Sequence, residues 1–244
     1  MAPDGETGTY KVEAKANDCW FWVGSDVPLL SGPPPSLVQG RFGKGVQLAD
    51  GAKLDLPAQG HLNLDEGTIE FWFEPMWDAP SGRKETVPYH YHQLFDSRDA
   101  GYDYGLVIYL YDGGEVTSGK SLIAAWADKD KADNVSVGVQ WKKDEWHHIA
   151  YAWKKTAEGK ASMRLYADGK QVGGKDDGKD FPTKLNANIR LGMNSTESAN
   201  TAANGVIDEL RISRVMRAPD LSGPLTMDGN TLLLRHFDDP GECR

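Results

Sequence analysis

The feature that most constrains the fold is a period-two pattern between Trp146 and Trp153. Every second residue is bulky, namely His147, Ile149 and Tyr151, and the residues between them include two alanines. Successive side chains of a β-strand point to opposite faces, so this stretch predicts a strand with one bulky face and one closely packed face.

A second strand follows after a charged turn. Met163, Leu165 and Ala167 alternate with polar or larger residues, and the pattern ends on Asp168-Gly169. An Asp-Gly pair favours the positive φ angles of a tight hairpin turn, so a further strand at 170–173 should return alongside. These segments predict neighbouring strands of an antiparallel sheet.

The composition is typical of an all-β chain. The 244 residues include 27 glycines and 13 prolines, which separate short apolar runs and favour many turns and few helices. A chain of this length supplies the core of one large β-sandwich or of two small domains.

The charge argues against some partners. The net charge is −9, so the surface repels phosphate backbones, and no basic patch interrupts it; we expect no nucleic-acid binding. No apolar run is long enough to cross a bilayer, so we expect no membrane insertion.

The first residues, MAPDGETG, contain no apolar secretory segment, which fits a cytosolic protein as well as a mature exported domain. The two cysteines, Cys19 and Cys243, are too few for a zinc site and are either bridged or free.

Three segments carry a resemblance to a known superfamily. The hairpin with RLYADGK at 164–170 resembles the laminin-G-like, concanavalin A-like domains, and the segments at 67–73 and 205–212 are similar to two further pieces of that superfamily in the same order. Together they cover most of residues 40–215. The resemblance implies an all-β, two-sheet antiparallel jelly-roll sandwich with almost no helix. It implies no reaction, because this fold carries lectins, adhesion domains and glycosidases.

The expected domain organisation follows. Residues 1–8 form a disordered leader, residues 9–217 form the laminin-G-like sandwich, and residues 218–244 form a linker and a terminal strand. The apolar stretch at 230–238 should complete the same sandwich as an edge strand, because an unpaired apolar strand aggregates. The alternative is that it opens a second module.

The strand at 67–75 raises the question of catalysis. Glu70 and Glu74 flank Trp72 on one face of this strand. Some glycosidases of related fold carry Glu-x-Asp-x-Glu here, with the outer pair as nucleophile and acid/base. Trp72 replaces the central Asp, which would hold the first carboxylate, so Glu70 and Glu74 are weak catalytic candidates.

Aromatic side chains are the candidate ligand contacts, because exposed rings stack on sugar faces. The candidates on strands are Trp72, Tyr109, Trp126, Tyr151 and Trp153. Tyr89 and Tyr91, in the long irregular segment at 76–103 with its one brief strand at 93–96, are candidates for a rim that contacts the sugar. The alternative is that these rings belong to the core or lie under the 76–103 segment.

The resemblance also implies a structural calcium ion. In similar domains an aspartate at the position of Asp208 binds calcium together with carbonyl oxygens of an N-terminal turn, which makes Asp208, Asp50 and Gly51 the candidate ligands. The alternative for Asp208 is a salt bridge or backbone hydrogen bonds, since a lone buried carboxylate is costly.

The function that we expect is non-catalytic binding of a polysaccharide or other glycan, by a lectin-like module of a larger secreted or cell-surface protein. One alternative is an adhesion or assembly domain that binds a protein or neighbouring domains of its own chain. A second is a glycosidase or polysaccharide lyase. Asn194-Ser195-Thr196 is formally a glycosylation sequon, which matters only in a eukaryotic secretory route.

Overall fold

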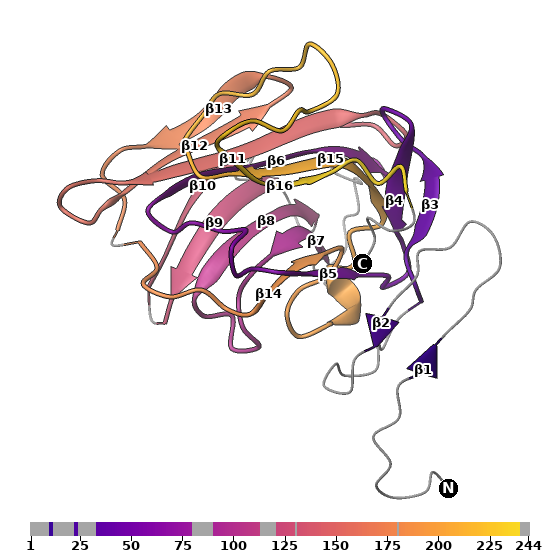
Figure 1. Ribbon diagram of the computed structural model, residues 1–244, viewed down its shortest axis with the longest axis horizontal. Coiled ribbons are helices and arrows are strands. Elements are labelled where there is room, and N and C mark those ends of the chain that lie inside the picture. Colours follow the sequence, from indigo (N-terminus) through magenta and orange to yellow (C-terminus); the bar gives the residue numbers. More distant parts are fainter. Residues whose placement is uncertain are drawn as a thin grey trace, which may run out of the picture.

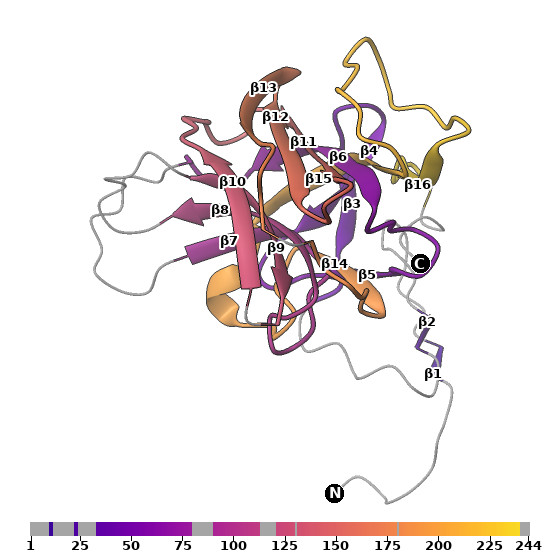
Figure 2. The same ribbon diagram turned by 90° about the vertical axis from the view of Figure 1, so that its left-hand side faces the viewer.

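A computed structural model of the chain describes residues 10–11, 22–23, 33–79, 90–112, 121–129, 131–179 and 181–239. These residues form two large antiparallel sheets stacked face to face, with the hydrophobic core between them (Figures 1 and 2). Their one helical element is a short 3-10 turn, η1 (Ala199–Thr201). The predicted two-sheet antiparallel sandwich with almost no helix is confirmed. None of the helical structure in these ranges has the length and apolar character that crossing a bilayer would require.

The first sheet has six strands and supplies one layer of the sandwich. In spatial order they are β10 (Lys131–Val137), β9 (Leu122–Asp128), β8 (Gly105–Asp112), β7 (His90–Asp96), β14 (Asn188–Leu191) and β5 (Leu54–Pro57). The segment at 76–103, expected to be irregular with one brief strand, therefore contains β7, a full strand in the interior of this sheet.

The second sheet has eight strands. Seven follow the order β13 (Lys170–Lys175), β12 (Ala161–Ala167), β11 (His147–Lys155), β6 (Glu66–Pro75), β15 (Gly205–Ser213), β4 (Lys44–Leu48) and β3 (Ser36–Gln39), and β16 (Thr231–Arg235) pairs with β15. The terminal strand thus belongs to the same sandwich. A separate two-stranded sheet joins β1 (Tyr10–Lys11) and β2 (Trp22–Val23).

The period-two pattern of β11 produces the core as predicted. Ile149, Tyr151 and Trp153 are fully buried between the sheets. The Trp153 ring occupies the space beside Gly67, its register partner on β6, where a Cβ atom would lie 2.3 Å from the indole. Glycine at this position is therefore required by the close approach of the ring.

The predicted Asp-Gly hairpin is also present. Asp168 and Gly169 adopt φ angles of 50° and 76°, and they connect β12 to β13. Positive φ at both central residues is the geometry of the tight turns that match the twist of paired strands.

The outer face of the eight-stranded sheet is covered at its centre. All nine residues of β15 are buried, including Glu209 and Arg211 on this strand. The backbone N–H of Leu225 donates to Glu209, and Arg211 donates to the carbonyl oxygen of Thr226. These bonds hold the segment that follows β15 over the centre of its own sheet (Figure 1), whereas alternate side chains of β12, Tyr166 among them, stay half-buried.

The fold predicts that removing the hydroxyl of Tyr151 stabilises the protein. Its hydroxyl is buried without a hydrogen-bond partner among the described residues, and burial raises the pKa of Tyr151 well above its usual range. An unpaired buried hydroxyl costs free energy, so Tyr151→Phe should raise the free energy of unfolding by about 1 kcal/mol in urea denaturation. Tyr166→Phe, on a half-buried ring of β12, is the control and should change it little. Destabilisation by Tyr151→Phe would mean that the hydroxyl has a partner.

Candidate functional site

Tyrosine side chains gather on the outer face of the six-stranded sheet. Alternate residues of β8 are buried in the core, which leaves Tyr109 and Tyr111 half-buried on the outer side. Tyr91 of the neighbouring strand β7 packs against both, with ring centroids 5.8 Å from Tyr109 and 5.2 Å from Tyr111. Two adjacent strands therefore fix three rings on a rigid surface.

A cavity of about 350 Å³ opens beside these rings, within the usual size range of small-molecule sites, roughly 300–1,000 Å³. We call it the tyrosine pocket; its lining residues are Tyr91, Gln93, Arg98, Tyr102, Tyr109, Asn194, Ser198, Asn200 and Thr201. Tyr91 is 36% exposed and Tyr102 is 41% exposed. Burial raises the pKa of Tyr109, so its phenol stays protonated at neutral pH and is able to donate a hydrogen bond. The pocket combines exposed rings with amide and hydroxyl groups.

One polar atom of this pocket is left without a partner. Gln93 lies on β7 opposite Tyr109 and is only 4% exposed, yet its Oε1 accepts no hydrogen bond from the described residues. A buried acceptor without a donor is costly, and such exceptions in native proteins require an explanation. A ligand hydroxyl donated into the pocket would supply the missing bond.

Arg98 borders the pocket, and Asp96 holds its guanidinium in place. Nε and Nη2 of Arg98 donate to the two carboxylate oxygens of Asp96, at 2.9 and 2.8 Å, and its backbone N–H donates to the same group at 2.9 Å. The guanidinium carbon lies 5.1 Å from the centroid of the Tyr102 ring, a cation–π contact. The pair therefore also positions an exposed ring of the pocket.

Two loops that are distant in the sequence are joined at the rim. The side-chain amide of Asn194 donates to the Tyr102 hydroxyl at 2.9 Å, and that hydroxyl lies 2.6 Å from the hydroxyl oxygen of Thr196. The Ser195 hydroxyl donates to the carbonyl oxygen of Asp99 at 2.7 Å. These bonds place the rim residues relative to the sheet.

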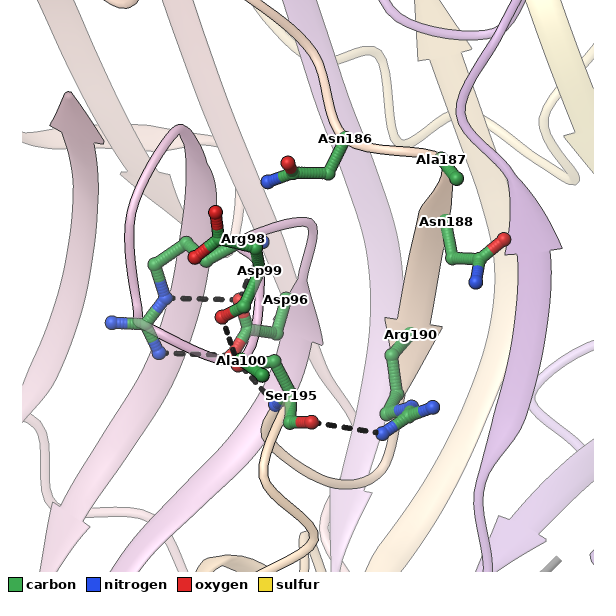
Figure 3. A pocket seen from close by; sticks show the side chains of 9 residues that line it. All are labelled: Asp96, Arg98, Asp99, Ala100, Asn186, Ala187, Asn188, Arg190 and Ser195. Atoms are coloured by element: carbon green, nitrogen blue, oxygen red, sulfur yellow. Dashed lines mark hydrogen bonds and ion pairs between the residues drawn. The ribbon is translucent and has the colours of Figure 1, made fainter. Parts of the chain in front are cut away.

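A second cavity, of about 270 Å³, is shown in Figure 3 and shares Arg98 with the tyrosine pocket. Its other lining residues are Asp96, Asp99, Ala100, Asn186, Ala187, Asn188, Arg190 and Ser195. Arg190 forms a two-bond ion pair with Asp55, with distances of 2.6 and 2.8 Å. This cavity is polar and carries no aromatic ring.

Several of the predicted ligand contacts are wrong. Trp126, Tyr151 and Trp153 are fully buried between the two sheets, so none of their surface is available to a sugar. Trp72 does lie on the opposite face of β6 from the core, but it is only 6% exposed, since the Phe42 ring packs edge-on against it. In each case a chain segment distant in the sequence covers the ring.

The structure places two of the predicted contacts, Tyr91 and Tyr109, in the tyrosine pocket, whereas Tyr89 lies outside the described residues, as do Cys19 and Cys243. Sequence reasoning missed Gln93, Arg98, Tyr102 and Asn194. The spacing of Tyr109 and Tyr111, two residues apart on one strand, was the one local signal for this face, since it puts both rings on the same side of the strand.

The weak catalytic candidates on β6 do not form an accessible acid pair. Glu70 is fully buried and pairs with Arg211, with 2.7 Å between Oε1 and Nη2. The His148 ring lies on its other side, 3.4 Å from Oε2. Burial, together with the nearby Asp144 charge, raises the pKa of the half-buried Glu74. Glu70 therefore has a structural environment and no surface open to a substrate.

A comparison with protein-family models decides the family. Residues 48–222, more than half of the chain, match the laminin-G-like model described as the concanavalin A-like lectin/glucanases superfamily. The chain belongs to this superfamily. A comparison with curated protein sequences finds no match.

Solved structures of similar fold have widely different sequences. Domain 4 of AbnA, a GH43 extracellular arabinanase from Geobacillus stearothermophilus in complex with arabinotriose, is 19% identical, with a TM-score of 0.56 over 77% of this chain and 79% of that one. The enzymatically active domain of tailspike protein 2 from bacteriophage CBA120 is 14% identical, with a TM-score of 0.57 over 84% of this chain and 32% of that one. Domains LG4-5 of the mouse laminin α1 chain are 14% identical, with a TM-score of 0.52 over 86% and 52%. At these identities the likeness concerns the fold.

The calcium ion implied by the resemblance to this superfamily does not fit the three candidate residues. Both carboxylate oxygens of Asp208 accept backbone N–H groups, from Phe42 at 2.9 Å and from Glu209 at 2.7 Å. The backbone N–H of Asp50 donates to the side chain of Asn204. Asn204 stands four residues before Asp208 at the β15 side of the antiparallel pair of β4 and β15, so the two residues are roughly 13 Å apart at ~3.3 Å per residue. Within the described ranges no three His, Cys, Asp or Glu side chains form a group that could hold a metal. Asp50 and Gly51 are thus not brought to Asp208, and calcium binding stays a prediction.

A buried histidine connects the pocket wall to the core of this superfamily fold. His92 follows Tyr91 on β7 and points inward, where its ring stacks on Trp77 with centroids 3.7 Å apart. Its Nδ1 lies 2.9 and 3.1 Å from the carbonyl oxygens of Ala202 and Ala203, so Nδ1 carries the proton and donates to both. This contact fixes the segment that supplies Asn200 and Thr201 to the pocket.

The His92 contact predicts a loss of stability in acid. Burial lowers the pKa of His92 to about 4, against partly opposing hydrogen bonds, from an ordinary value near 6.5 in the unfolded chain. Between these values the unfolded chain binds more protons, so the stabilisation is complete above pH 6.5 and is lost as the pH falls through 4. The total is roughly 3 kcal/mol.

Urea unfolding from pH 7 to pH 4 measures this loss, and His92→Gln is the comparison. The variant should be less stable at pH 7 but should lose less with acidification. Ring nitrogen shifts of His92 in NMR should remain those of neutral imidazole at pH 5.5; a midpoint near 6.5 would contradict the buried geometry.

Proposed function

We propose that the chain is a non-catalytic carbohydrate-binding module that binds a glycan in the tyrosine pocket. The observation that carries the proposal is the buried Oε1 of Gln93, which has no donor among the described residues although it lines a pocket walled by tyrosines. A sugar hydroxyl is a donor of the right size for such an acceptor, and a sugar face is a suitable partner for a ring.

The remaining chemistry of the pocket supports a sugar. Tyr91 and Tyr102 present exposed ring surface, and rings of this kind combine an apolar face with a hydroxyl that donates or accepts. Asn200 and Thr201 add short polar groups at the rim. Aromatic rings and convergent polar groups that fix the orientation of a ligand are both typical of small-molecule sites. The fold also accommodates sugars in another protein, since the AbnA domain was solved with arabinotriose.

The alternatives receive less support. Among the described residues the large hydrophobic side chains that are exposed are Met76, Tyr91, Tyr102 and Met227. Two of these belong to the polar tyrosine pocket, so the described surface lacks the broad apolar patch that favours a protein partner. A glycosidase needs a reachable pair of carboxyl groups, and the described lining of the tyrosine pocket contains no carboxylate.

The place where the module acts is also a proposal. We infer that the module acts outside the cell or at its surface, as part of a larger secreted or surface protein. Support comes from the superfamily and from the extracellular arabinanase whose domain 4 has a similar fold.

The direct test is a glycan array, followed by calorimetric titration of the best ligand. Tyr91→Ala removes the most accessible ring of β7 and should weaken binding roughly tenfold, equivalent to about 1.4 kcal/mol of lost stacking. Tyr166→Ala is the matched control, because Tyr166 is a half-buried tyrosine on the other sheet. Equal losses in both variants, or no binding to any glycan, would overturn the proposal.

Gln93 offers a test with two opposite readouts. Gln93→Leu removes the unpaired acceptor, so it should weaken glycan binding about tenfold while leaving the thermal midpoint unchanged or higher. A variant that loses stability but keeps its affinity would mean that Gln93 is a structural residue and not a ligand contact.

A further inference from the structure

The charges around the tyrosine pocket restrict the kind of glycan it accepts, an argument that rests on the proposed function. Of the nine described residues that line the pocket, Arg98 is the one with a charged side chain. The pocket would therefore attract an acidic sugar only through this guanidinium.

The charge of Arg98 is already compensated. Asp96 is 2% exposed and accepts from both Nε and Nη2 of Arg98 in a two-bond pair. The third nitrogen, Nη1, points away from Asp96 (Figure 3), and the described residues give it no partner. The guanidinium thus offers N–H groups to a ligand oxygen, while the adjoining carboxylate weakens its attraction for an anion.

The next cation along the sheet is compensated as well. Arg190 pairs with Asp55, and its Nη1 lies 3.1 Å from Glu197. Glu197 also pairs with Lys53, which is buried. The cationic groups beside the two cavities are therefore bound to carboxylates in the structure itself, in a chain whose net charge is −9.

We propose that the tyrosine pocket selects uncharged glycans and that Asp96 enforces this selection by neutralising Arg98. A carboxylate or sulfate group placed beside Nη1 meets the attraction of Arg98 and, from the far side of the guanidinium, the opposing repulsion of Asp96, so a reduced net attraction is set against the loss of its hydration. A hydroxyl oxygen accepts the same N–H group with a much smaller desolvation cost. Asp96 is thus a specificity-determining residue that acts through Arg98.

The test compares matched pairs of oligosaccharides that differ in one acidic group, namely neutral chains and their uronate, sialylated or sulfated counterparts. The wild-type chain should bind the neutral member of each pair at least tenfold more tightly. Its affinity for either member should not change between low and high salt, because screening acts on net charges. Tighter binding of the acidic members, falling with salt, would overturn the inference but leave carbohydrate binding intact. Silence towards every glycan would instead remove the proposed function.

Asp96→Asn sharpens the test, because it uncovers the charge of Arg98. Affinity for the acidic glycans should rise roughly tenfold and should become salt-dependent. The control is Asp96→Asn combined with Arg98→Gln, which removes both charges and should show no such gain. A folded Asp96→Asn variant that gains nothing would overturn the role of Asp96. If thermal unfolding shows that either variant does not fold, the salt dependence and the matched pairs measured on the wild-type chain decide the inference.

Discussion

The ion pair between Arg211 and Glu70 holds a later segment of the chain over the centre of the eight-stranded sheet. Both charges lie on the outer side of the eight-stranded sheet and are withdrawn from water, a situation that is stable only when each charge is paired and hydrogen-bonded. Arg211 completes its bonding on the carbonyl oxygen of Thr226, which brings the segment after β15 over the sheet. The centre of one sheet is therefore covered on both sides, and the outer face of the other carries the tyrosine pocket.

On the open face, the strands hold the aromatic rings and the loops supply the polar groups. β7 and β8 hold three tyrosines at fixed spacing, and the loops around residues 97–104 and 192–201 add the polar groups. Hydrogen bonds between these loops, and from His92 to the segment behind them, fix the polar groups relative to the rings. Binding groups are most effective when their positions are set in advance, because less ordering accompanies ligand binding.

The sequence allowed the fold to be predicted more fully than the site. Period two in β11 and the Asp168-Gly169 turn act between neighbours in the chain, so they could be interpreted locally. A period-two pattern does not indicate which other segment of the chain covers a given face of the strand. Trp126 and Trp153 were wrong as ligand contacts for that reason, since the covering partner is the opposite sheet.

Other features of the site are non-local. The first part of β7 escaped prediction, since His90, Tyr91 and His92 show no alternation of apolar and polar residues. Arg98 and Tyr102 were missed because their role depends on a loop some 90 residues further along the chain, as the separation of 92 residues between Tyr102 and Asn194 illustrates. The two calcium ligands proposed at Asp50 and Gly51 failed to meet Asp208 because β4 and β15 run antiparallel and carry them apart.

The buried amide of Asn194 has a consequence for producing the protein. Asn194 is 2% exposed, and its Nδ2 donates to Tyr102 at the rim of the pocket. A glycosylating enzyme acts on that same nitrogen, so it reaches the sequon only before the chain folds. An attached oligosaccharide would then occupy the place of the tyrosine hydroxyl and hold the two loops apart. Material modified in a eukaryotic secretory host and material made in bacteria would therefore differ at the rim itself, and the bond between Asn194 and Tyr102 belongs to the unmodified form.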